Sequence, residues 1–500
     1  MASAHKFRFA GSLLAAAALS GCGQGDVIRD PYRANVIVLS LDTLRADRLG
    51  VYGNQDGLTP FLDDLAEGGV VMDRCIASAT WTLPSHWTLF LGQHQSSHGV
   101  WTRSSTYDGA QPTMAEVFQA ADYETAAFVG GGFVSSEFGF ASGFDTFDEQ
   151  SRSGLGELME YLPRLEEWVA RPRAHPFFLF LQMYDVHRPY TPALEDLALV
   201  RPDASLSDLD HGKPPQGIPG DAWDPDTLGI TESLYDAEVR VLDTALKDLF
   251  STLDENGLLD NTLVVVTSDH GEAFMEHGWL GHGSRPYQEL VHIPWILSGP
   301  GLARGTRVSG PVALADIEPT IMGIVGVPDP GERDGRDLSS LMSGSDPNRV
   351  ADKPVFAEMI GPEGSFDALA VHQGEWTLLR VEGMADSLFH TALDPLQQHN
   401  LAAKRPRALQ HLSKVADQWI RTHTPRRSAG LAALHPFLRR VLEQKSPEEF
   451  EDWITSHDPI EAQQMGEFLE REGTQEDDQL EQRRLQLIRQ LHDLGYLEDN

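Results

Sequence analysis

The stretch Asn-Val-Ile-Val-Leu-Ser-Leu-Asp at residues 35–42 decides the fold. Its nearly continuous apolar run is typical of a strand that is buried on both faces. Similar runs recur along the chain, at Thr125–Val129, Phe177–Met183, Leu263–Thr267 and Pro294–Leu297. Helix-like stretches lie between them, at Pro60–Glu67, Met114–Ala121 and Glu232–Leu253. This alternation predicts an α/β fold in which helices cover both faces of a large, mostly parallel sheet.

Beyond this region the pattern changes, and we divide the chain accordingly. The large α/β domain is predicted to span residues 35–346. A small antiparallel subdomain is expected over residues 347–404, because short strand-like pieces occur at Val355–Met359, Ala368–His372 and Glu375–Val381. Residues 405–500 are predicted to form a helical, acidic tail. Its last apolar residues share one helical face, which indicates a docking face: Leu480, Leu487, Ile488, Leu491 and Leu494.

The N-terminus has the pattern of an export signal. Lys6 and Arg8 precede an apolar run, residues 9–19, that is too short to cross a bilayer. The sequence Leu-Ser-Gly-Cys that ends at Cys22 resembles the lipobox of bacterial lipoproteins. We therefore expect a signal peptide over residues 1–21, lipidation of Cys22 and a tether over residues 22–34, so that the protein is anchored in the bacterial cell envelope, by default at the outer membrane. The alternative is an ordinary cleaved signal.

Charge limits the partners. The chain has 39 Lys and Arg residues against 75 Asp and Glu residues, a formal net charge of −36. Such a field repels the phosphate backbone, which argues against nucleic acid as a partner. An anionic substrate must therefore be held by a local positive centre, such as a metal ion.

Three predicted strands end in polar side chains. Asp42 ends the first strand, Asp185 and His187 follow the strand at 177–183, and Asp269 and His270 follow the strand at 263–267. Ligands of open α/β sheets bind at the carboxyl ends of the strands. Asp oxygens and His nitrogens suit a divalent metal ion such as zinc or manganese. Singly, each of these residues is also compatible with a turn or a loop hydrogen bond.

A hydroxyl group lies at the start of a predicted helix. In Thr82-Leu-Pro-Ser-His86, Pro84 suits the first turn of a helix that continues to Leu91. The free N–H groups and the dipole at such an end favour an anion. Thr82 is therefore a candidate nucleophile facing a phosphate or sulfate group, with a helix N-cap as the alternative role.

Taken in order, the motifs LDTLRADRLGVYG (41–53), TWTLPSHWTLFLG (80–92), DVHRPY (185–190) and TSDHGEAFMEHG (267–278) resemble the sulfatase branch of the alkaline phosphatase superfamily. The resemblance covers roughly residues 35–401. It implies an alkaline-phosphatase-like sandwich around a mixed sheet, a bound divalent cation, and transfer of a sulfuryl or phosphoryl group to a side-chain nucleophile.

The resemblance also implies roles for individual residues. It assigns the metal to Asp42, Asp269 and His270, and the nucleophile to Thr82. Catalytic contacts to substrate oxygens or the leaving group fall to His187 and His282. Contacts to the substrate are expected from His86, Arg45 and Asp185.

The chain departs from the sulfatase pattern at several positions. Thr82 stands where the family has the Cys or Ser that becomes formylglycine, and His86 stands where it has Arg. Thr43 replaces a second Asp, which moves the expected cation from calcium or magnesium towards zinc or manganese. His282 replaces a Lys.

From these residues we expect a metal-dependent hydrolase that cleaves sulfate or phosphate esters through a covalent Thr82 intermediate. Its anionic substrate is expected to be an ester of a glycan or of a lipid headgroup. Two alternatives stay open. Related phosphoethanolamine transferases use Thr as the nucleophile, so the enzyme could transfer the group to an acceptor. The protein could also be a catalytically inactive, metal-binding lipoprotein.

Overall fold

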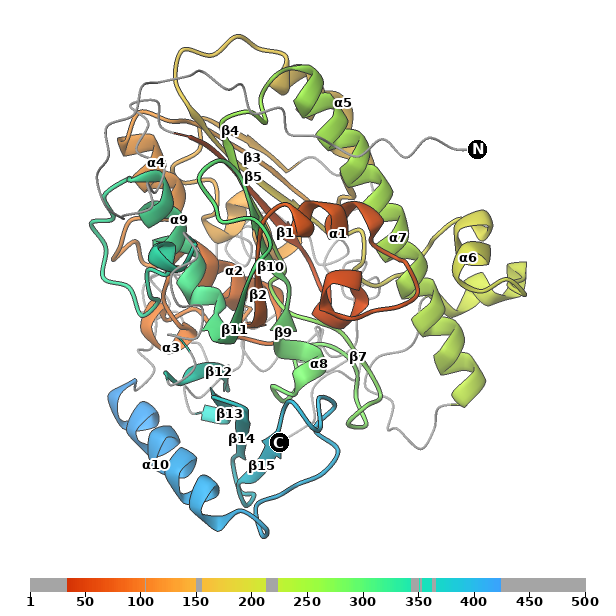
Figure 1. Ribbon diagram of the computed structural model, residues 1–500, viewed down its shortest axis with the longest axis vertical. Helices are drawn as coiled ribbons and strands as arrows, with labels where there is room; N and C mark the ends of the chain where they lie inside the picture. The colour runs from red at the N-terminus through yellow and green to blue at the C-terminus, as the bar shows by residue number, and fades with distance from the viewer. Residues whose placement is uncertain are drawn as a thin grey trace, which may run out of the picture.

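A large sheet runs through the middle of the molecule with helices on both faces, and a smaller sheet lies at one end with a helix across it (Figure 1). This architecture is that of a computed structural model, which describes residues 34–103, 105–149, 155–212, 224–342, 350, 353–361 and 366–423. The predicted α/β fold with a large mixed sheet and a small antiparallel sheet is confirmed.

Within these residues the large sheet has nine strands in the order β11-β2-β10-β6-β1-β5-β3-β4, with β9 paired to β2. The pairs of β1 with β5 and β6, and of β3 with β4 and β5, are parallel, whereas β10 is antiparallel to both its neighbours. The bounds are β1 Asn35–Leu41, β2 Val70–Ile76, β3 Glu124–Val129, β4 Thr146–Asp148, β5 Phe177–Met183, β6 Thr262–Thr267, β9 His292–Ile293, β10 Trp295–Ser298 and β11 Thr306–Ala313.

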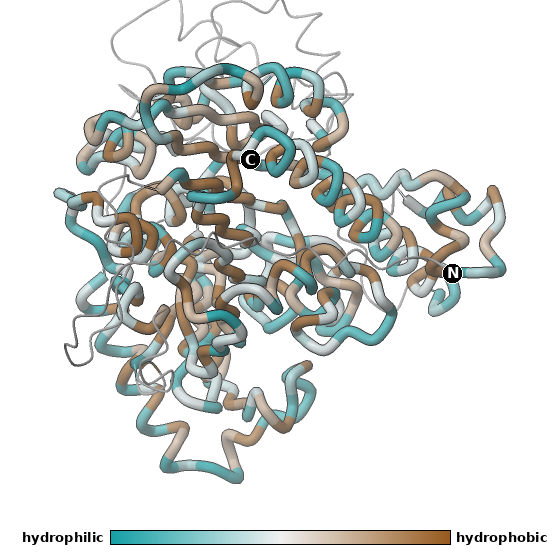
Figure 2. Tube along the Cα trace, turned by 45° about the horizontal axis from the view of Figure 1, so that its top comes forward, coloured by the Kyte–Doolittle hydropathy of each residue, from teal (hydrophilic) through white to brown (hydrophobic). Residues whose placement is uncertain are grey.

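Alternate side chains of each strand enter two separate hydrophobic cores. Val36 and Val38 of β1 belong to the core on one face, and Ile37 and Leu39 belong to the core on the other. Helices α2 Thr82–Leu91, α4 Met114–Ala120 and α9 Ile317–Val325 cover the first face, and α3 Gln95–His98 adjoins α2. Helices α1 Pro60–Glu67, α5 Leu158–Val169, α6 Leu194–Val200 and α7 Pro225–Glu255 cover the second. The most hydrophobic stretches accordingly gather in the interior (Figure 2).

The small sheet is antiparallel and follows the order of the chain, with β12 Val355–Ile360, β13 Phe366–Gln373, β14 Trp376–Val381 and β15 Ser387–His390. Helix α10, Pro406–Thr422, packs on it through Leu412 and Ala416. The buried carboxylate of Glu358 accepts hydrogen bonds from Ser96 of α3 and from the Trp419 indole of α10. The first part of the stretch expected to be a helical tail is thus a helix of this subdomain's core.

Several predictions lie outside the described residues: the signal peptide, the lipidation of Cys22, most of the tether, and the acidic helix near Leu480. Among the described residues, no helix is both long and apolar enough to span a membrane.

Candidate active site

The register of two neighbouring strands brings Asp42 and Asp269 together. β1 and β6 pair in parallel with Ser40 opposite Thr267, and in both segments the aspartate comes two residues after the paired residue. Both carboxylates are fully buried at the carboxyl edge of the sheet. The sequence predicted this juxtaposition from the strand ends alone.

The two carboxylates are poorly neutralised by the protein. Within the described part of the chain, Asp42 Oδ1 and Asp269 Oδ2 have no hydrogen-bond partner. Burial raises the pKa of the Asp42 carboxyl well above its usual range, and the negative charge of Asp269 raises it further. Buried carboxylate oxygens without partners are costly unless a cation lies between them.

His270 adds a nitrogen to the same place. Its Nδ1 donates a hydrogen bond to the Gly271 carbonyl oxygen at 2.8 Å, so its Nε2 carries the lone pair. Burial lowers the pKa of His270 to about 4, which keeps the ring neutral. Nε2 nevertheless lies 3.2 Å from Asp269 Oδ2. Two electron-rich atoms at this distance repel each other, and a metal ion that both of them bind would relieve the repulsion.

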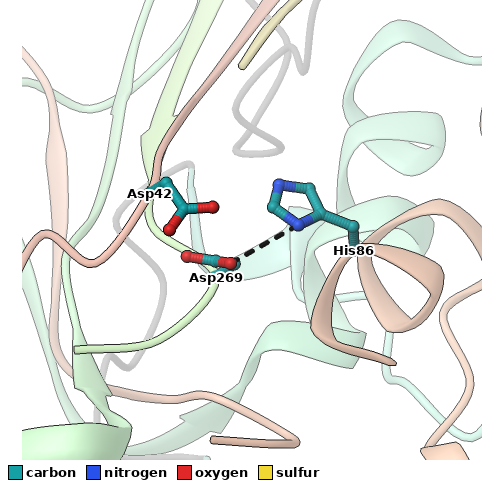
Figure 3. Close-up of side chains that lie close together, drawn as sticks. All are labelled: Asp42, His86 and Asp269. Carbon is teal, nitrogen blue, oxygen red and sulfur yellow. Dashed lines mark ion pairs between the residues drawn. The ribbon is translucent and has the colours of Figure 1, made fainter. Parts of the chain in front are cut away.

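His86 lies beside Asp42 and Asp269, and ligand atoms of the three residues fall within 4.8 Å of one another (Figure 3). Both ring nitrogens already have partners, however. Nδ1 donates to the Thr82 carbonyl oxygen at 2.9 Å, and Nε2 lies 3.0 Å from the Ser40 hydroxyl. His86 is fully buried, and the contact with substrate expected of it stays a prediction. Through its hydrogen bonds it holds the first turn of α2 against the edge of the sheet that carries the two aspartates.

The candidate nucleophile Thr82 lies at the start of a helix, as predicted, but it is not the N-cap residue of that helix. Thr82 is the first residue of α2, and the N-cap is the preceding residue, Trp81, without a side-chain cap. The Thr82 hydroxyl lies 3.3 Å from His270 Nε2, where it donates a hydrogen bond to the lone pair. Thr82 is therefore not a capping threonine. Its hydroxyl points at the group that sits beside the two aspartates.

Two further histidines complete a row of imidazoles. The ring centres of His270 and His282 are 4.6 Å apart, and those of His282 and His187 are 5.0 Å apart. His187 Nδ1 donates to the Arg188 carbonyl oxygen, and burial, followed by the charge of His282, lowers the pKa of His187 to about 3. His187 is thus neutral, with an acceptor at Nε2.

The orientation of His282 depends on a residue that was not assigned a role from the sequence. The fully buried Glu272 accepts a hydrogen bond from His282 Nδ1 at 3.0 Å and another from the Tyr190 hydroxyl at 3.0 Å. Its place directly after Asp269-His270-Gly271 was the available signal. Helix α8, Gln288–Val291, and the hairpin of β7, Ala273–Phe274, and β8, Leu280–Gly281, hold the loop that carries these residues.

Arg45 and Asp185, both expected to bind substrate, pair with protein groups in this structure. The buried guanidinium of Arg45 pairs with Asp47 and Glu276 at 2.7 and 2.6 Å and also donates to the Glu272 carbonyl. The Asp185 carboxylate accepts the Leu158 N–H at the start of α5. Both side chains make structural contacts, and the contact with substrate expected of each stays a prediction.

The residues present fit a divalent cation. Asp42 and Asp269 each have one carboxylate oxygen without a hydrogen-bond partner among the described residues, and ligand atoms of the two lie within 4.8 Å of each other at the buried ends of β1 and β6. The His270 lone pair lies 3.2 Å from the Asp269 oxygen. Oxygen and nitrogen donors of this kind are the usual protein ligands of divalent metals. The Thr82 hydroxyl adjoins the same point, which places a potential nucleophile next to a potential Lewis acid.

The family model described as sulfatase matches residues 34–327. An ulvan-active sulfatase of Formosa agariphila is 25% identical over 416 residues, which cover 75% of this chain and 78% of that protein.

Solved structures share the fold. A protein solved in complex with its substrate D-glucosamine-2-N,6-O-disulfate superposes with a TM-score of 0.65 at 18% identity, covering 78% of this chain and 98% of that chain. The phosphonate monoester hydrolase of Agrobacterium radiobacter gives a TM-score of 0.63 at 19% identity, over 78% and 96% of the two chains. With the family model matched over more than half its length, this chain belongs to the sulfatase family.

Proposed function

We propose that this protein hydrolyses sulfate or phosphate esters, with Thr82 as the nucleophile and one divalent cation held by Asp42, Asp269 and His270. One observation carries the proposal: the Thr82 hydroxyl lies 3.3 Å from His270 Nε2, which lies 3.2 Å from an Asp269 oxygen that has no hydrogen-bond partner among the described residues. The substrates named for similar proteins, ulvan and a glucosamine disulfate, support an anionic ester, such as that of a glycan.

The cation would bring Lewis-acid chemistry that lowers the pKa of the Thr82 hydroxyl and withdraws charge from the transferring group. Two oxygen donors and one nitrogen donor favour zinc or manganese over calcium or magnesium. The Thr82 hydroxyl loses its proton to solvent, and its oxygen attacks the sulfur or phosphorus atom while the bond from that atom to the leaving oxygen, on the opposite side, breaks. The ester formed on Thr82 is then hydrolysed by water.

The remaining residues manage protons. His282 gives a proton from Nε2 to the leaving oxygen, because Glu272 holds its Nδ1 hydrogen. His187 presents a lone pair, so it accepts a hydrogen bond from the water that attacks the Thr82 ester and does not stabilise negative charge. His86 keeps the first turn of α2, and with it Thr82, at a fixed distance from Asp269.

A substrate screen tests the reaction class. The purified protein, loaded in turn with zinc, manganese, calcium and magnesium, is assayed on aryl sulfates, phosphate monoesters, phosphodiesters and phosphonate esters. Turnover of at least one class with release of the free acid is expected. Stoichiometric metal binding without turnover on any ester would instead identify an inactive metal-binding protein.

Glu272→Gln is expected to lower kcat by about 10- to 100-fold, the usual cost of losing a residue that orients an active-site group. An amide cannot accept hydrogen bonds from both His282 and Tyr190 as the carboxylate does. The alkaline limb of the pH–kcat profile is expected to change as well, because His282, the proton donor to the leaving oxygen, loses its carboxylate partner.

The matched control is Glu289→Gln. Glu289 forms a similar buried pair with His277 at 2.7 Å, but it does not contact the row of imidazoles. This control should keep kcat and its pH profile. An unchanged pH profile in Glu272→Gln would argue against the positioning role.

We also propose that the protein is a lipoprotein anchored through Cys22 in the cell envelope. Cys22→Ser should move the protein from the detergent phase to the aqueous phase on phase partitioning of cells that express it. Cys75→Ala, which changes the buried cysteine of β2, is the control and should leave partitioning as in the wild type. Detergent-phase recovery of Cys22→Ser would refute the anchor.

A further inference from the structure

The contacts around Thr82 close into a ring. Thr82 bonds His270, and His270, His282 and His187 follow one another at ring-centre distances of 4.6 and 5.0 Å. His187 meets the edge of Tyr184 at 5.3 Å.

The ring of contacts returns to Thr82 through a loop after β3. The Tyr184 hydroxyl donates to the Gly131 carbonyl, and two residues later the Phe133 ring packs edge to face on Trp81 at 5.5 Å. Trp81 immediately precedes Thr82 in the chain. The nucleophile is thus a member of a closed circuit of imidazole and aromatic side chains.

Exposure separates the members of this circuit. Thr82, His270 and Tyr184 are buried, whereas the other four side chains are only half-buried: His187, His282, Trp81 and Phe133. The partly accessible members of the circuit are therefore of two kinds: two imidazoles, and an indole next to a phenyl ring that adjoins the nucleophile in the chain through Trp81. We call Trp81 and Phe133 the aromatic wall.

The aromatic wall is held rigidly. Gly132 has a φ of +56°, which disfavours any side chain, and a Cβ on Gly130 would lie 2.5 Å from Tyr184 Cδ2. The loop backbone is thus pressed against Tyr184. Phe133 also packs on Phe138 at 5.3 Å and lies 5.5 Å from the Arg103 guanidinium carbon. Large half-exposed rings fixed in this way lose little entropy when a ligand packs on them.

We propose that the aromatic wall is the subsite for the leaving alcohol and selects esters whose alcohol carries a six-membered ring with a flat apolar face, a pyranose or an arene. This inference rests on the proposed function, because it divides the site into a half that handles the transferring group and a half that binds the alcohol. The imidazole side carries the proton that the leaving oxygen needs. Packing of ring on ring supplies affinity for cyclic alcohols that an open chain cannot match.

Kinetics on matched esters test the proposal. Three sulfate esters are compared: 4-nitrophenyl sulfate, methyl glucopyranoside 6-sulfate and glucitol 6-sulfate. The three corresponding phosphate esters are assayed in the same way. Methyl glucopyranoside and glucitol share a primary leaving oxygen and differ in whether the ring is closed. Each variant is compared with wild type on the same ester, so differences in leaving-group reactivity cancel.

Phe133→Leu and Trp81→Leu should each raise KM for the ring esters about tenfold, which corresponds to about 1.4 kcal/mol, and change kcat less. The values for glucitol esters should change less than about twofold. The two ring esters show which ring the aromatic wall prefers. It prefers a pyranose if KM changes more for the glucopyranoside ester, and an arene if KM changes more for the nitrophenyl ester. Phe147→Leu, which alters a half-buried phenyl ring on β4 outside the circuit, is the control.

A binding measurement separates this inference from the proposed function. Saturation-transfer NMR of methyl glucopyranoside and phenol with metal-loaded protein reports on the subsite without turnover. Loss of transfer in Phe133→Leu but not in Phe147→Leu supports the wall even if no ester is hydrolysed. Equal KM effects on ring and open-chain esters, or equal saturation transfer in both variants, would overturn it.

Discussion

Thr82→Ala is expected to lose about 10³-fold or more in kcat while the fold and the bound metal are retained, because a nucleophile that forms a covalent intermediate cannot be replaced by a methyl group. The cost in stability should be only about 0.5–1.5 kcal/mol, the worth of one hydrogen bond, since Trp81 rather than Thr82 caps α2. Turnover with saturating substrate and thermal unfolding of the same preparation measure both quantities.

The matched control for this variant lies on the same helix. Thr88 is buried, and its hydroxyl also lies 3.3 Å from a histidine nitrogen, that of His98. Thr88→Ala removes an equivalent hydrogen bond without touching the row of imidazoles, and it should keep wild-type kcat. If both variants turned over at the wild-type rate, water activated by the cation would be the attacking group.

Asp269→Ala is expected to abolish stoichiometric binding of a divalent cation, and Asp42→Ala and His270→Ala should do the same. Metal analysis of dialysed protein measures this. Asp185→Asn is the control, because it alters a buried carboxylate that bonds α5 instead. With free cation at about 100 times its Kd, the wild type should gain about 2.7 kcal/mol over the metal-free protein, and Asp269→Ala should gain nothing. Wild-type metal content in all three ligand variants would refute the site.

The metal-free protein should also show a pH dependence of known sign. The pKa of Asp42 is raised in the folded state, above its value in the unfolded chain, by burial and then by Asp269. The contribution of Asp42 to stability is therefore fully present below the unfolded pKa and is lost as pH rises through the folded pKa. In chelator, the Tm of wild type should fall with rising pH over this range, and Asp42→Asn should show a weaker fall. The same pH dependence of Tm in wild type and Asp42→Asn would contradict the close approach of the buried Asp42 and Asp269 carboxylates.

Much of this architecture could be predicted from local sequence. The run at Asn35–Leu41 is so uniformly apolar that both ends of β1 coincide with the prediction. The closeness of Asp42 and Asp269 could be predicted because each comes within two residues of the end of a buried strand, and parallel strands end at the same edge of a sheet. The place of Thr82 at a helix start followed from Pro84 and the apolar spacing after it.

Other features depend on partners far away in the chain. β2 carries Asp73 and Arg74 in its middle, and β11 contains Pro311 beside an irregular register, so neither segment has the pattern of a buried strand. Arg45 has the motif position of a substrate contact, but one of its two carboxylate partners, Glu276, is more than two hundred residues away. The local sequence offers only Asp47 as a partner and does not indicate the second one.

The proposed mechanism requires a covalent ester on Thr82, which can be trapped. Metal-loaded protein is quenched in acid during turnover of a 4-nitrophenyl ester, digested, and its peptides are weighed by mass spectrometry. The peptide that contains Thr82 is expected to be heavier by a single sulfuryl or phosphoryl group. No such modified peptide is expected from Thr82→Ala. An unmodified Thr82 peptide from enzyme quenched in the burst phase, while product continues to form, would contradict it.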